Sequence, residues 1–146
     1  MTEEIADNID WKDYLGWTEE QIEDLRFAGY SYIRQGKYEI ALPFFEALSV
    51  VDPDELYDQQ TLGALFLQVG NPSKALRFLD KALLKNPTHV PTLLNRTKAL
   101  LLLGYKEKGL RLAKKLQQSS EPFVANSAKA LVLAYDRSDI EDQDDN

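Results

Sequence analysis

Apolar residues recur at spacings of three and four along most of the chain, which is the pattern of one face of an α-helix. One such run predicts a helix over residues 123–135, with apolar side chains at Val124, Ala128, Leu131, Val132 and Tyr135. Thr18 and Gln21 enclose two glutamates in the form of a capping box, which predicts the start of a long helix. The chain is therefore predicted to be all-α.

Upstream of the capping box lies a short apolar cluster. Asp10 can cap a short helix, and four large side chains follow it at Trp11, Tyr14, Leu15 and Trp17. Such a cluster needs a surface that covers it, either the protein's own first helices or a second copy of the chain. These four residues are therefore candidates for self-association.

The chain also repeats itself with a period of 34 residues. The pairs at this spacing are Gly29 and Gly63, Gly36 and Gly70, Gly70 and Gly104, Ala41 and Ala75, and Pro53 and Pro87. Small residues suit the crossing of two helices, a glycine suits the turn between them, and a proline ends the second helix. This period and residue order resemble the tetratricopeptide repeat, a helix–turn–helix unit.

The resemblance implies an all-α solenoid of three helix pairs, flanked by a short N-terminal helix and a C-terminal capping helix. We place the repeats at residues 22–55, 56–89 and 90–123, followed by the capping helix at 123–135. Together they form a body over residues 18–135. Residues 1–17 are predicted to be an acidic arm with a short helix. The tail at 136–146 is predicted to be disordered, because it is acidic with a single large apolar residue.

The first repeat is similar to a narrower family. Gly36-Lys37-Tyr38-Glu39 leads to Ala41, and Phe45-Glu46-Ala47-Leu48 leads to Asp52. A Gly-Lys-Tyr-Glu-x-Ala turn and a Phe-x-Ala-Leu-x-x-x-Asp helix resemble those of the class II chaperones of bacterial type III secretion. Membership would imply a bacterial cytoplasmic chaperone that binds an extended, Pro-x-Leu-x-x-Pro-like segment of a secreted translocator protein in its concave groove. It would also imply a dimer formed through the N-terminal helices.

The first helix of each repeat is expected to line that groove. The positions that face it by the repeat frame are Arg26, Tyr30, Ile33 and Arg34, then Tyr57, Gln60, Ala64, Leu67 and Gln68, then Leu94, Lys98, Leu101 and Leu102. The tyrosines suit a wet groove, because a phenol has both an apolar ring and a polar tip. The alternative for Ile33, Leu67 and Leu101 is a place in the core, since apolar residues at helical spacing are more often core than binding surface.

The distribution of charge along the chain limits the kinds of partner that the protein can bind. The 146 residues carry a net charge of −7, but residues 1–24 carry −8, residues 136–146 carry −5 and residues 25–135 carry +6. The acidic ends argue against a nucleic-acid partner. The second helices of the second and third repeats carry basic residues that fit either a solvated outer face or contact with an acidic partner. These residues are Lys74, Arg77, Lys81 and Lys85, then Arg111, Lys114 and Lys115.

Nothing in the sequence points to an enzyme, a cofactor or a metal site. The chain has no cysteine and a single histidine, His89, which is expected to lie solvated in a turn between repeats. The acids at Asp52, Asp54, Glu55 and Asp58 lack the spacing of a calcium loop and fit a helix cap instead. The start of the chain does not resemble a signal peptide, and the run Ala99–Leu103 is too short to span a membrane.

Two functions remain open. The first is a cytoplasmic chaperone that keeps an apolar segment of a secreted translocator-type protein soluble until export. The second is a general repeat adaptor, or a chaperone or regulator of the needle subunit, within the secretion apparatus.

Overall fold

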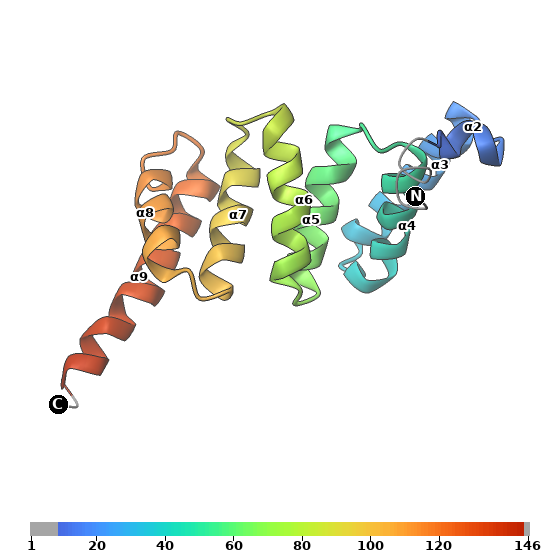
Figure 1. The fold of residues 1–146 in the computed structure, drawn as a ribbon. Helices are drawn as coiled ribbons and strands as arrows, with labels where there is room; N and C mark the ends of the chain where they lie inside the picture. Colours follow the sequence, from blue (N-terminus) through green and yellow to red (C-terminus); the bar gives the residue numbers. More distant parts are fainter. Residues whose placement is uncertain (1–8, 145–146) are drawn as a thin grey trace, which may run out of the picture.

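The computed structural model describes the backbone of residues 9–144 and the side chains of residues 9–136. Within that part of the chain it contains helices and no strand. The helices are α2 (Trp11–Leu15), α3 (Glu19–Arg34), α4 (Tyr38–Val51), α5 (Leu56–Gln68), α6 (Pro72–Lys85), α7 (Val90–Leu102), α8 (Lys106–Leu116) and α9 (Pro122–Asp144). The pairs α3–α4, α5–α6 and α7–α8 stack in chain order and α9 packs on the last pair (Figure 1). The predicted all-α repeat solenoid is confirmed.

Each helix pair turns at a glycine of the 34-residue repeat. Gly36, Gly70 and Gly104 have φ values of +71°, +81° and +91°, a conformation that strains any residue with a Cβ. The glycines inside the first helices have a different role. A Cβ at Gly29 would lie 2.8 Å from Cε2 of Phe45, so the absence of a side chain lets α3 and α4 approach closely.

The third repeat has different residues at the point where its two helices cross. Gly109 stands where the earlier repeats have Ala41 and Ala75, and a Cβ on it would lie 2.4 Å from Cδ2 of Leu101. Leu101 therefore occupies the space that a side chain at 109 would take. Thr97 replaces the crossing glycine of the first helix, and it is buried with its hydroxyl donating to the carbonyl oxygen of Leu93 at 2.9 Å.

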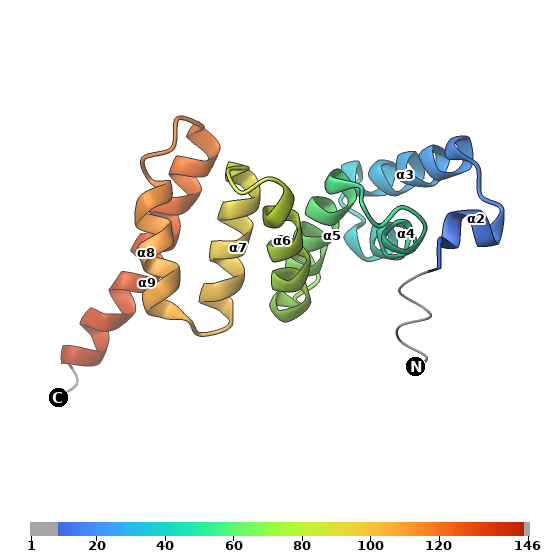
Figure 2. The ribbon, with the colours of Figure 1, turned by 45° about the horizontal axis from the view of Figure 1, so that its top comes forward.

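The N-terminal helix forms as its cap predicts. The carboxylate of Asp10 accepts a hydrogen bond from the Asp13 amide at 3.3 Å, and α2 packs against α4 (Figure 2). Trp17 packs against the core, whereas Tyr14 and Leu15 are exposed. The capping box at Thr18 is complete, since its hydroxyl accepts from the Gln21 amide and the Gln21 side chain accepts from the Thr18 amide.

The C-terminal helix is longer than the sequence pattern predicts. The capping helix was expected to end at Tyr135 and to be followed by a disordered tail over 136–146, but α9 continues to Asp144 and its end extends away from the stack (Figure 1). The expected boundary came from the end of the apolar pattern. No glycine or proline follows Tyr135, so nothing in the backbone stops the helix there.

The described helices include none with the combined length and apolar character needed to cross a lipid bilayer.

Candidate peptide-binding cavity

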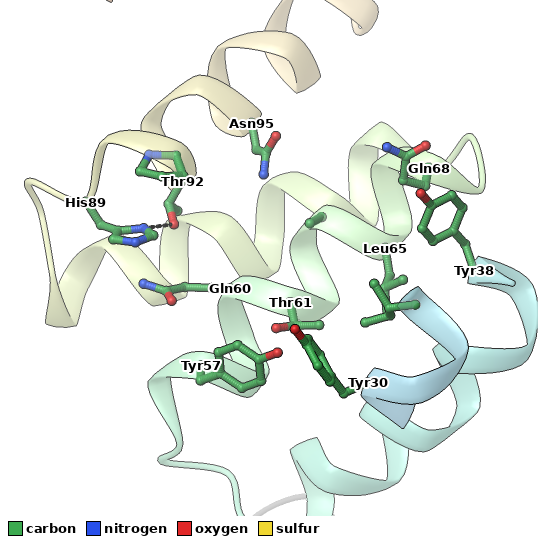
Figure 3. Close-up of a pocket in the computed structure, with 13 residues that line it drawn as sticks. Tyr30, Tyr38, Tyr57, Gln60, Thr61, Leu65, Gln68, His89, Thr92 and Asn95 are labelled. Atoms are coloured by element: carbon green, nitrogen blue, oxygen red, sulfur yellow. Dashed lines mark hydrogen bonds between the residues drawn. The ribbon is translucent and has the colours of Figure 1, made fainter. Parts of the chain in front are cut away.

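A cavity of about 350 Å³ opens between the first helices of the three repeats (Figure 3). Side chains of α3, α5 and the start of α7 line it, together with Tyr38, which is the first residue of α4. Its lining residues are Tyr30, Ile33, Tyr38, Tyr57, Gln60, Thr61, Ala64, Leu65, Gln68, His89, Pro91, Thr92 and Asn95. None of these is a lysine, arginine, aspartate or glutamate, so the cavity suits an uncharged ligand.

One side of the cavity is aromatic and aliphatic. Figure 3 shows Tyr30, Tyr38 and Leu65 on this side, where α3 meets α5. Tyr57 lies beside Tyr30 (Figure 3), and burial raises the pKa of its phenol. This side can enclose an apolar side chain while the phenols remain wet.

The opposite side of the cavity is polar. His89 caps the start of α7, and its Nδ1 lies 2.7 Å from the hydroxyl oxygen of Thr92. Gln60 of α5 and Asn95 of α7 lie beside this pair (Figure 3). Neither amide forms a hydrogen bond with another residue of the described part of the chain, so both are available to a ligand.

Six of the predicted groove residues line this cavity, namely Tyr30, Ile33, Tyr57, Gln60, Ala64 and Gln68. Arg34, Lys98 and Leu102 lie outside it, with Arg34 and Leu102 exposed and Lys98 half-buried. Leu67 also lies outside, half-buried against the core. Residues of the first two repeats therefore make up most of the cavity wall, while the third repeat contributes residues near the start of α7.

The prediction that Leu94 and Leu101 face the groove is wrong. Leu94 is 2% exposed and Leu101 is 3% exposed. Leu101 turns onto α8 because Gly109 leaves room for it there. Leu94 lies on α7, which packs against α5, α6, α8 and α9, so this helix exposes less surface than α3.

Arg26 was also predicted to face the groove, but it forms ion pairs instead of lining the cavity. Its Nε and Nη2 each donate to one carboxylate oxygen of Asp58 at 2.7 Å, and Nη2 also donates to Asp52 at 2.9 Å. Glu23 is a further partner on the same helix. The Asp58 side chain is only 1% exposed, and its hydrogen bonds raise the pKa of the Arg26 guanidinium further above its usual value.

The same contacts explain the acidic cluster at the first inter-repeat turn. Burial raises the pKa of the Asp58 carboxyl, and the two hydrogen bonds from Arg26 act in the opposite direction. Glu55 caps α5 by accepting from the Tyr57 amide at 3.4 Å. Among residues 9–136 no group of three or more His, Asp and Glu side chains is arranged to hold a metal ion.

Sequence reasoning missed the α7 side of the cavity. Pro91 follows Tyr57 by 34 residues and Asn95 follows Thr61 by the same interval, so the repeat frame could have found Pro91. His89 was expected to be solvated, but it is half-buried in the cavity wall. Tyr38, which the sequence places in the Gly-Lys-Tyr-Glu turn, both packs against the core and lines the cavity.

No protein-family model matches the sequence, and no curated protein sequence matches it either. Solved structures do. PcrH from Pseudomonas aeruginosa, in complex with the chaperone binding region of PopD, is 23% identical with a TM-score of 0.69, over 85% of this chain and 97% of its own. SycD, a type III secretion chaperone from Yersinia enterocolitica, in complex with a peptide of the translocator YopD, is 22% identical with a TM-score of 0.68, over 84% and 97%.

A structure outside secretion is similar as well. The first tetratricopeptide repeat domain of Spaghetti (RPAP3), bound to the HSP90 peptide SRMEEVD, is 16% identical with a TM-score of 0.67, over 80% of this chain and 94% of its own. The chain therefore has the tetratricopeptide-repeat solenoid fold, which translocator chaperones and an HSP90-peptide binder share.

Proposed function

We propose that the protein is a type III secretion chaperone of the translocator class, which holds an extended apolar segment of a secreted protein in the cavity between α3, α5 and α7. The observation that carries this proposal is the uncharged, tyrosine-lined cavity on the first helices. Similarly folded PcrH and SycD were solved with segments of PopD and YopD, which supports it. The protein would act in the bacterial cytoplasm by sequestration, with apolar cavity surface replacing water around the cargo and no catalysis.

The similarly folded repeat domain of RPAP3 was solved with a ligand of different chemistry. The HSP90 peptide SRMEEVD bound by RPAP3 has three acidic side chains, and an acidic peptide is best held by cations. No lysine or arginine lines the cavity of this chain. The cavity therefore favours an uncharged apolar segment over an acidic peptide.

We expect Ala64→Arg to weaken cargo binding by about tenfold or more, which corresponds to a loss of about 1.4 kcal/mol or more in binding free energy. Ala64 lies in the cavity wall on α5, so the new side chain would fill the space that the cargo needs and would add a charge there. The measurement is recovery of bound protein from the native host, identified by mass spectrometry. The matched control is Ala130→Arg, because Ala130 is exposed on α9 outside the cavity.

The identity of the recovered protein separates the two functions. A secreted translocator-type protein that is lost with Ala64→Arg and kept with Ala130→Arg supports the chaperone. Recovery of a needle subunit or another component of the apparatus would favour the adaptor. Equal recovery with both variants would remove the cavity from either function.

Self-association through the N-terminal helix is a separate proposal. Tyr14 and Leu15 are exposed on α2, whereas Trp11 and Trp17 are half-buried within the same chain, so only the first two are free to meet a second copy. Tyr14→Lys combined with Leu15→Lys should reduce the mass measured by light scattering to that of one 16.7 kDa chain. Leu84→Lys, on an exposed site of α6, is the control that should leave the mass unchanged. A wild-type protein that already has the mass of one chain would refute the dimer.

A further inference from the structure

The polar side of the cavity has unused hydrogen-bonding capacity. The amides of Gln60 and Asn95 have no hydrogen-bond partner within the described residues, although both lie in the cavity wall. Each carries an acceptor oxygen and two donor N–H groups. An apolar ligand that covered them would displace their water and return no hydrogen bond, which costs binding energy.

His89 adds a third such group. Its Nδ1 is engaged with the Thr92 hydroxyl at 2.7 Å. If the hydroxyl donates to Nδ1, Nε2 carries the proton and donates; if Nδ1 donates to the hydroxyl, Nε2 accepts. In both tautomers Nε2 has no partner among the described residues, so the ring can match either a donor or an acceptor on a ligand.

The two sides of the cavity differ in chemistry, which means that they can recognise different parts of one segment. Tyr30, Tyr38 and Leu65 lie together on the aromatic side, and Gln60, His89 and Asn95 lie on the other (Figure 3). The aromatic side favours an apolar side chain. The polar side favours a group that both donates and accepts, and it has no lysine or arginine to compensate a carboxylate that loses its water.

We propose that Gln60, His89 and Asn95 form a second subsite, which selects an uncharged polar side chain of the cargo, such as Asn, Gln, Ser or Thr, near its apolar anchor. This inference rests on the proposed function, since it specifies which segments the cavity accepts. A subsite built from hydrogen-bonding groups discriminates strongly against a ligand that lacks a partner for them. The subsite would therefore separate cargo segments that have the same apolar anchor.

The test uses fluorescein-labelled ten-residue peptides with one fixed Leu in an alanine and proline background. Asn, Leu or Asp is placed in turn at each of the other positions, and affinity for the full chain is measured by fluorescence anisotropy. We expect one position where Asn binds about tenfold tighter than Leu or Asp, which corresponds to one hydrogen bond gained or lost.

Two variants of similar shape locate the effect. Asn95→Leu replaces the amide by an apolar group and should abolish or invert the preference for Asn over Leu. Gln68→Leu makes the equivalent change beside Tyr38 on the aromatic side, so it should leave the preference intact. Thermal unfolding followed by circular dichroism verifies that both variants are folded.

The outcomes separate this subsite from the proposed function. Peptides that bind the cavity with no preference for Asn at any position, or with a preference that Asn95→Leu leaves unchanged, overturn the subsite and leave the chaperone proposal standing. Absence of binding by every peptide overturns both.

Discussion

Replacing Arg26 by alanine is expected to lower the free energy of unfolding by about 3–5 kcal/mol, the cost of breaking a buried ion pair by removing one partner. The carboxylate of Asp58 is 1% exposed and accepts two hydrogen bonds from this guanidinium, each at 2.7 Å. Without Arg26 that charge would stay buried and lose its principal partner. Urea unfolding followed by circular dichroism measures the loss.

Arg34→Ala is the matched control for this variant. Arg34 ends the same helix in an exposed position, so its removal should change the free energy of unfolding by less than about 0.5 kcal/mol. Arg26→Met combined with Asp58→Leu should recover much of the loss, because well-packed apolar pairs often replace buried ion pairs without cost. A single Arg26→Ala variant as stable as wild type would show that the pair contributes little to the fold.

The Arg26 ion pair also bears on the cavity. It joins α3 to α5 across the first repeat boundary, and its two residues neighbour the cavity along these helices. Tyr30 lies about one turn after Arg26, and Tyr57 directly precedes Asp58. Loss of cargo binding in an Arg26 variant would thus reflect a displaced cavity wall, and Ala64→Arg is the cleaner test of the cavity itself.

The architecture could be predicted because its signals are local and periodic. The turns within the helix pairs need a positive φ, and glycines occupy them at positions 36, 70 and 104. Each of these glycines lies where the 34-residue period predicts a turn. The cap at Thr18 is equally local, since the side chains of Thr18 and Gln21 each accept a hydrogen bond from the other residue's backbone amide. The length of α9 could not be predicted from the apolar pattern, because a helix can continue beyond the surface that it covers.

The cavity could be predicted only in part, because equivalent repeat positions have different neighbours. Arg26, Gln60 and Leu94 occupy one position of the repeat, yet the first forms ion pairs, the second lines the cavity and the third is buried. The partners that decide this, Asp58 and the helices around α7, are distant in sequence or belong to another element. The repeat frame predicts the direction of a side chain on its helix but not what it meets.

Phe45→Ala is expected to be among the most destabilising single changes in the protein, with a loss of about 3–5 kcal/mol in the free energy of unfolding. Phe45 is 0% exposed, and its ring fills the space left by the missing side chain of Gly29. The ring also stacks edge-on against Tyr57 of α5, with ring centroids 6.4 Å apart. Truncation would thus open a void between α3 and α4 and remove a contact with the second repeat.

Phe27→Ala is the matched control, since Phe27 lies on α3 but is 72% exposed. We expect it to change the free energy of unfolding by less than about 0.5 kcal/mol. The contrast tests the helix crossing directly, because both are phenylalanines of the first repeat and only Phe45 lies against Gly29 where α3 and α4 cross. Equal losses from the two variants would mean that the α3–α4 crossing at Gly29 is not the centre of the first repeat's stability.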